Sequence, residues 1–311
     1  LVTANPGTGK TLLLAAKYVD LLKQGVLPED ILCLTFTTKA RREMEERILK
    51  LIKEENLTID LSHLQIFTFH SYALENIDNN ELISSNLLRY AIFRYLKDHE
   101  TLNYNDNYLI EVIVPKMENL IRYLKNFGIT PGHINVDEAK KHLQPDKSYT
   151  FADLSLFLEQ FVNIYHYYEH IKSKSGIDYS DMLLHFLKLK QHKVYKFVLV
   201  DELQDVNGIE ADIALQSGEI FFAVGDKKQA IFGFQGGSIL NFRKFEKAVS
   251  FILSDNFRST NEILSYAREH FNAKSKENEY TAELKNLKNK EQRDTAAKPI
   301  VYDVAKRIKH G

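Results

Sequence analysis

The fold is decided by the stretch Ala4-Asn5-Pro6-Gly7-Thr8-Gly9-Lys10-Thr11. It follows an apolar start at Leu1 and Val2 and precedes a run of good helix formers at positions 12–16. A strand, a glycine-rich turn and a helix in this order are the context that a phosphate-binding loop requires. Gly7 and Gly9 let the backbone curl, so that successive amides point at phosphate oxygens beside a helix N-terminus. The stretch therefore predicts an α/β protein that binds a nucleotide.

The side chains at the end of this loop predict its chemistry. Lys10 is placed to neutralise the outer phosphates, and the Thr11 hydroxyl is placed to ligate Mg²⁺. Ala4 stands where the general pattern has glycine. The alternative is a plain strand-to-helix turn without a ligand. The residues expected to contact the nucleotide here are Asn5, Pro6, Gly7, Thr8, Gly9, Lys10, Thr11 and Leu12.

A strand that ends in two acidic residues is predicted far along the chain. Four apolar residues at 197–200 are followed by Asp201 and Glu202. An apolar run of this kind is typical of a strand buried on both faces, and ligands bind at the carboxyl edge of parallel sheets. We expect Asp201 to hold Mg²⁺ through water, and Glu202 to orient and deprotonate the attacking water. About 190 residues separate the two motifs, so a domain-sized insertion is expected between them.

Composition narrows the class of protein. The 311 residues are 44% hydrophobic and 27% charged, as in ordinary folded proteins. No apolar run approaches a membrane span and no signal peptide opens the chain, and the single Cys33 fits a reducing compartment, so a cytoplasmic protein is expected. The net charge of −1 predicts that any nucleic-acid contact comes from local patches and stacking Phe and Tyr rings. Because Leu1 and Val2 already read as a strand, we expect a piece of a longer protein.

The continuation of the acidic strand carries a family resemblance. The residues Asp201-Glu202-Leu203-Gln204-Asp205 closely resemble the DEFQD box of superfamily 1A helicases, the UvrD, Rep and PcrA family. Further segments resemble the family's other motifs in the expected order, at residues 31–44, 67–71, 176–183, 224–234 and 253–260. Motifs in register thus cover residues 1 to about 260.

The resemblance implies a RecA-like P-loop sheet with an inserted all-helical subdomain. Residues 1–75 and 197–250 would form the first ATP-binding motor domain, residues 76–196 the inserted helical subdomain, and residues 251–311 the incomplete start of a second motor domain. The insertion also contains His166 and His170 in an inverted zinc-protease spacing. That motif needs a third ligand, and a helix face rich in Tyr and His is the reading that we favour.

The resemblance also implies roles around the nucleotide. Gln229 would sense the γ-phosphate, and Arg258 would act as an arginine finger that stabilises the transferring phosphoryl group. Phe257 matches the aromatic position that stacks on adenine. The family usually has an arginine on the opposite side of the base, where this chain has Leu12, so adenine would lose a cation–π partner and base selectivity could relax.

At the positions where the family contacts single-stranded DNA, this chain has aromatic side chains and polar side chains. Aromatic rings would stack on bases or pack in the core, and polar side chains would contact the backbone. These candidates are Phe36, Phe232 and Phe234, and Thr37, Thr68 and His70. The chain departs from the family with Phe234 for Trp, Gln235 for Arg, and Lys227 and Lys228 for two acids.

The function that the resemblance implies is an ATP-dependent DNA helicase with 3′-to-5′ polarity, acting in repair or recombination. Its cofactors would be ATP and Mg²⁺, and its partners would be single-stranded DNA and ss/ds junctions, with no membrane. The alternatives are a helicase subunit of a recombination nuclease, a non-catalytic DNA-binding or regulatory module, and an RNA substrate. The sequence identifies no protein partner.

Overall fold

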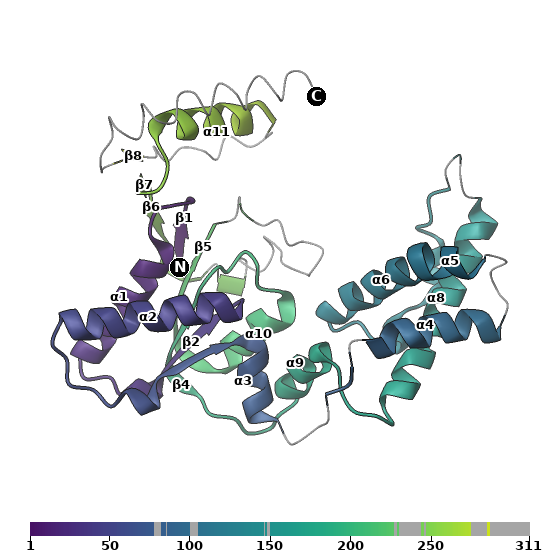
Figure 1. Cartoon of the computed structure of the whole chain (residues 1–311), viewed down its shortest axis with the longest axis horizontal. Helices are drawn as coiled ribbons and strands as arrows, with labels where there is room; N and C mark the ends of the chain where they lie inside the picture. The colour runs from purple at the N-terminus through teal and green to yellow at the C-terminus, as the bar shows by residue number, and fades with distance from the viewer. Residues whose placement is uncertain are drawn as a thin grey trace.

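A six-stranded parallel sheet forms the centre of the molecule (Figure 1). The computed structural model describes residues 1–77, 82–84, 86–99, 105–145, 147, 150–226, 229, 244–245, 247–274 and 285–286. The strands are β1 (Val2–Ala4), β2 (Ile31–Thr35), β3 (Gln65–Thr68), β4 (Tyr195–Val200), β5 (Gly218–Gly225) and β6 (Phe251–Leu253). They lie in the order β3-β2-β4-β5-β1-β6, and each neighbouring pair is parallel. This confirms the predicted α/β fold with a parallel sheet.

The sheet is buried on both faces, as its apolar strands require. Successive side chains of a strand point to opposite faces. In β2, Leu32 and Leu34 pack in one hydrophobic core, and Ile31 and Cys33 pack in the other. One layer is formed by α1 (Lys10–Lys23) and α2 (Thr38–Glu54). The other is formed by α3 (Phe69–Asn76), α9 (Tyr179–Leu187) and α10 (Gly208–Gln216).

The residues between α3 and α9 form a separate group of helices, drawn to one side of the sheet in Figure 1. These elements are α4 (Asn86–Asp98), the single turn α5 (Asp106–Tyr108), a π-helical stretch (Leu109–Ile113), α6 (Val114–Asn126), α7 (Val136–Lys140) and α8 (Phe151–Lys172). Buried apolar residues of α4, α6 and α8 form a third hydrophobic core of their own. The one β-bridge described in this region pairs Leu82 with Ile177, where the chain leaves and re-enters the sheet domain. The described part of the insertion is therefore helical, as predicted.

Parallel strands bring distant parts of the sequence to one edge. The carboxyl ends of β1, β5, β4, β2 and β3 lie side by side in that order, because all six strands run the same way. The glycine-rich loop follows β1, Asp226 follows β5, and Asp201 follows β4. Phe36 follows β2, and Thr68 ends β3. Predicted nucleotide and DNA residues thus occupy two halves of one edge.

The sheet ends at β6, which pairs with β1 and places Val2 opposite Phe251. Phe251–Leu253 therefore belong to the six-stranded sheet, whereas the sequence predicted that a second domain begins at residue 251. The chain continues with β7 (Asp255–Asn256), which pairs with β8 (Lys285–Asn286), and with α11 (Asn261–Lys274).

Within the described residues, no helix combines the length and apolar character that crossing a bilayer would need. Short 3-10 turns occupy Pro28–Asp30, Leu61–His63 and Pro131–His133.

Candidate active site

The glycine-rich loop adopts the conformation that a phosphate cradle needs. Gly7 and Gly9 have φ angles of 73° and 89°, in the left-handed region that favours glycine. Gly9 is the N-cap of α1, so the helix begins at Lys10 and its amide end faces the loop. The Thr8 hydroxyl donates to the Asn5 carbonyl oxygen over 2.8 Å and closes the turn. The loop is thus shaped for an anion, in accord with its sequence.

The acids after β4 lie against the loop despite their distance in sequence. The Thr11 side chain lies close enough to the Asp201 carboxylate to favour its charged form, which by itself lowers the pKa of that acid. Lys10 Nζ lies 3.6 Å from Glu202 Oε2, and the lysine is nearly buried. Glu202 itself has a φ of 48°, a conformation that costs a non-glycine residue free energy and that clusters at functional sites. The structure therefore brings together the four residues that the sequence predicts to act on the triphosphate.

Two buried carboxyl groups lie near these residues, and few neighbouring groups stabilise their charged forms. Burial and the neighbouring charge of Glu202 raise the pKa of Asp201 to about 6. The same two causes raise the pKa of Asp205 to about 6. Asp205 Oδ1 is buried and has no hydrogen-bond partner among the described residues. Hydroxyl and carboxylate oxygens are the ligands that Mg²⁺ prefers, so Thr11 and Asp201 fit the donor set of a magnesium site.

A chain of hydrogen bonds connects these acids to the end of β5. Gln204 Nε2 donates to Glu202 Oε2 over 2.8 Å, and Gln204 Oε1 accepts from the Asp226 N–H over 2.8 Å. Asp226 Oδ2 in turn accepts from Gln229 Nε2 over 2.9 Å. Gln229 lines the same pocket as Lys10. The predicted γ-phosphate sensor is therefore linked to Glu202 through two intervening residues.

The segment after β6 packs directly on the glycine-rich loop. Asn256 is fully buried, and its Nδ2 donates to the Pro6 carbonyl oxygen. The Phe257 N–H donates to the Gly7 carbonyl oxygen over 2.8 Å. A side chain at position 7 would clash, because its Cβ would lie 2.6 Å from the Cβ of Arg258. The close fit explains why the loop needs glycine at position 7.

This segment also supplies side chains to the pocket rim. Arg258 lines the pocket together with Leu12. Leu12 is 49% exposed and Phe257 is 43% exposed, so both apolar side chains remain accessible to a base. Asn256, which holds the segment in place, lies in the motif at 253–260 but was not among the predicted site residues.

A cation that the sequence did not single out also lines the pocket. Arg47 lies on α2, which packs against α1, and its side chain reaches the pocket of Lys10 and Arg258. Nothing local marks this arginine, because α2 is rich in charged residues on its outer face. Only the packing of the two helices places it beside the loop. Arg47 thus adds a positive charge to the pocket that Lys10 and Arg258 also line.

The four predicted DNA residues that the structure describes lie at the ends of β2 and β3 and at the starts of α2 and α3. Thr37 and Thr68 are the N-caps of α2 and α3, and each side chain accepts a backbone N–H of its helix. Phe36 is partly exposed beside Thr37. His70 Nδ1 lies 3.9 Å from Oε1 of the buried Glu210. Phe232 and Phe234, like Lys227, Lys228 and Gln235, lie outside the described residues.

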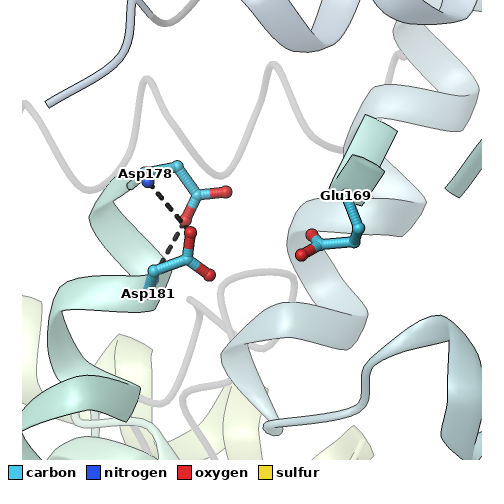
Figure 2. A group of neighbouring side chains, drawn as sticks. All are labelled: Glu169, Asp178 and Asp181. Carbon is cyan, nitrogen blue, oxygen red and sulfur yellow. Dashed lines mark hydrogen bonds between the residues drawn. The ribbon is translucent and has the colours of Figure 1, made fainter. Parts of the chain in front are cut away.

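A second cluster of charges lies where the helical insertion rejoins the sheet domain. Glu169 projects from α8 toward Asp178 and Asp181 at the start of α9, and the two aspartates cap that helix reciprocally (Figure 2). The three carboxylates are close enough to hold a metal ion, but two buried lysines already occupy the space between them. Lys125 donates to all three acids, and Lys172 donates to Glu169 and Asp181. The cluster is therefore an ionic joint between α6, α8 and α9, and we call it the joint.

Comparison with known proteins identifies the fold's relatives. The family model of the UvrD/REP helicase N-terminal domain matches residues 1–250. A probable DNA helicase II homolog of Rickettsia conorii is 28% identical over 86% of this chain and 41% of its own length. The ATP-dependent DNA helicase PcrA of Leuconostoc citreum is 26% identical over 86% of this chain and 36% of its own length. PcrA of Bacillus subtilis is 26% identical over 86% of this chain and 37% of its own length. The chain thus spans about two fifths of the curated relatives that it matches.

Proposed function

The chain belongs to the UvrD/REP helicase family, and on this premise we propose that it is the ATP-binding part of an ATP-dependent DNA helicase. The observation that carries the proposal is the single carboxyl edge of the sheet. There Lys10 and Thr11 meet Asp201 and Glu202, and the positions predicted to contact DNA follow on the neighbouring strands. A motor that couples hydrolysis to strand movement needs both sites on one rigid element.

The pocket residues divide the work of ATP hydrolysis among them. Lys10, Arg47 and Arg258 line the pocket and would surround the phosphates with positive charge, and Thr11 and Asp201 would hold Mg²⁺. Bound Mg²⁺ neutralises charge on the phosphates. Glu202 takes the proton of the attacking water. Phe257 and Leu12 offer the base two apolar surfaces in place of the usual aromatic–cation pair.

The finer parts of the function follow from the family and from the names of the relatives. We propose movement along single-stranded DNA with 3′-to-5′ polarity, engagement of ss/ds junctions, and a role in repair or recombination in the cytoplasm. Thr37, Thr68 and His70 would contact the DNA backbone, and Phe36, Phe232 and Phe234 would meet the bases. A non-catalytic DNA-binding module is the alternative from another class, and a helicase subunit of a recombination nuclease is the alternative within this one. The strained conformation of Glu202 favours catalysis, because a module without turnover has no use for it.

ATP hydrolysis by the full-length protein, with and without single-stranded DNA, tests this function. We expect DNA to stimulate hydrolysis, and Glu202→Gln to lower kcat by about 10²–10⁴-fold, as loss of a general base does. Glu219→Gln, on the exposed part of β5, is the matched control and should hydrolyse ATP like the parent. The proposal would be contradicted if single-stranded DNA left the rate of hydrolysis unchanged, or if Glu202→Gln hydrolysed ATP like the parent. DNA binding without hydrolysis would favour the non-catalytic module.

A further inference from the structure

Gln204 occupies the space between the ends of β4 and β5. Its side chain is buried, with 2% of the residue exposed. One end of the amide donates from Nε2 to Glu202 Oε2 over 2.8 Å. The other end accepts at Oε1 from the Asp226 N–H over 2.8 Å. A buried side chain whose two ends are both bonded in this way has one position and one orientation.

The amide of glutamine matches its two neighbours, because it offers both a donor and an acceptor. An ionised carboxylate such as that of Glu202 only accepts, and a backbone N–H only donates. The site therefore needs a donor and an acceptor, separated by the width of an amide. Glutamate at position 204 would keep the acceptor for Asp226 and lose the donor for Glu202. Methionine would keep the length and lose both.

The Glu202 carboxylate has few other contacts among the described residues that could fix its position. Lys10 Nζ lies 3.6 Å from the same Oε2, beyond the range of a good hydrogen bond. In the proposed function Lys10 moves onto the phosphates when ATP binds, and the ion pair is then lost. The backbone of Glu202 is in the left-handed region, so the turn itself is under strain. With Lys10 engaged by phosphate, the bond from Gln204 is the side-chain contact of this carboxylate that remains among the described residues.

The far end of Gln204 leads to the residue predicted to sense the γ-phosphate. Asp226 accepts from Gln229 twice, at its carbonyl oxygen over 3.0 Å and at Oδ2 over 2.9 Å. A shift of this segment therefore moves the Asp226 N–H, and Gln204 follows it because its Oε1 is bonded there. We propose that Gln204 is a positioning residue, which holds the Glu202 carboxylate for its attack on water and links its position to the segment that carries Gln229. This inference rests on the proposed function and deepens it.

Steady-state ATP hydrolysis by the full-length protein tests the proposal with two variants. We expect Gln204→Met to lower kcat by about 10–100-fold, the size of effect seen when a group that orients a catalytic ligand is lost. KM for ATP should stay within about threefold, because uniform substrate binding is untouched. Gln160→Met, on α8 in the helical insertion, makes the same chemical change away from the pocket and should leave kcat unchanged. If the parent hydrolyses ATP and Gln204→Met matches it, this inference fails while the proposed function stands.

The second variant, Gln204→Glu, separates positioning from mere packing. Its carboxylate would keep the size of the side chain and the acceptor for the Asp226 N–H, but it would face Glu202 without a donor. We expect kcat to fall about as far as in Gln204→Met with KM for ATP within about threefold, whereas a side chain that only filled space would leave kcat at the parental value. Parental kcat in Gln204→Glu would overturn the proposal even if Gln204→Met were unstable.

A double variant shows whether Gln204 acts through Glu202. In the Glu202→Gln background, we expect Gln204→Met to lower the residual kcat by less than about twofold, because residues that act as a unit are not additive. An undiminished further loss in that background would show that Gln204 acts elsewhere, and would overturn the proposal.

Discussion

The nucleotide pocket and the joint are built from the same kinds of side chain, but their charges are balanced in opposite ways. In the joint, burial opposes the charge on Lys125, yet the surrounding carboxylates raise its pKa well above the usual range. Burial likewise opposes the charge of Asp181, yet Lys125 and Lys172 hold its pKa below the usual value. In the pocket the pKa values of Asp201 and Asp205 are raised, to about 6. Raised pKa values of buried acids indicate a site with too little positive charge nearby until a cation binds. A lowered acid pKa indicates an acid that is already paired with cations of the protein.

The largest expected effect comes from removing a pocket acid. Asp201→Asn should lower kcat for ATP by at least about 10²-fold, because several kcal/mol of charge stabilisation at the phosphates depend on the metal. The thermal midpoint of the nucleotide-free protein should stay equal or rise, since a buried acid with a raised pKa is relieved. Calorimetry beside an ATPase assay measures both. A marked loss of stability would mean that the pocket is built like the joint.

The joint should behave in the opposite sense. Lys125→Met leaves three acids facing Lys172 alone, and breaking a buried ion pair from one side costs about 3–5 kcal/mol in the free energy of unfolding. Urea denaturation of the full-length protein measures the loss. Lys23→Met, which breaks the exposed pair with Glu55, is the control and should change stability little. If the two variants unfold alike, the joint does not stabilise the fold.

The pH dependence of the two clusters should differ in sign. Asp201 and Asp205 have raised pKa values in the folded protein, so their contribution to stability is present below pH 4 and is lost as the pH rises through about 6. Asp181 has a lowered pKa, so its contribution is present above pH 4 and is lost as the pH falls through its folded value. Asp201→Asn should flatten the first trend and Asp181→Asn the second. Thermal midpoints between pH 3 and 7 would show whether they do.

The smallest expected effect concerns the base. In the proposed function, Leu12→Arg would offer the base a guanidinium in addition to the ring of Phe257, and an exposed cation–π contact is worth about 0.5–1 kcal/mol. We expect the Kd for ATP to fall by about two- to fivefold, from the same principle, with less change for a pyrimidine nucleotide. Leu12→Lys provides the charge without the planar group. Equal tightening by both variants would point to the phosphates rather than the base.

Local patterns in the sequence and the family resemblance predicted the fold and all of the residues that line the pocket except Arg47. The glycine-rich loop and the acids after β4 were recognisable because backbone conformation, burial and chemistry are all encoded within a few residues. Arg47 was missed because it reaches the pocket through the packing of α2 on α1. The lysines of the joint were missed for the same reason, since Lys125 and Asp181 are 56 positions apart. Gln204 stood in a recognised motif, but its partner Asp226 follows a different strand, β5, so its role could not be inferred from the motif alone.

The anchoring of Asn256 on the glycine-rich loop limits how the predicted arginine finger can travel. Arg258 follows two residues whose polar groups are bonded to Pro6 and Gly7, so its Cα is tethered to the floor of the pocket. Its guanidinium must therefore arrive by rotation about its own side-chain bonds.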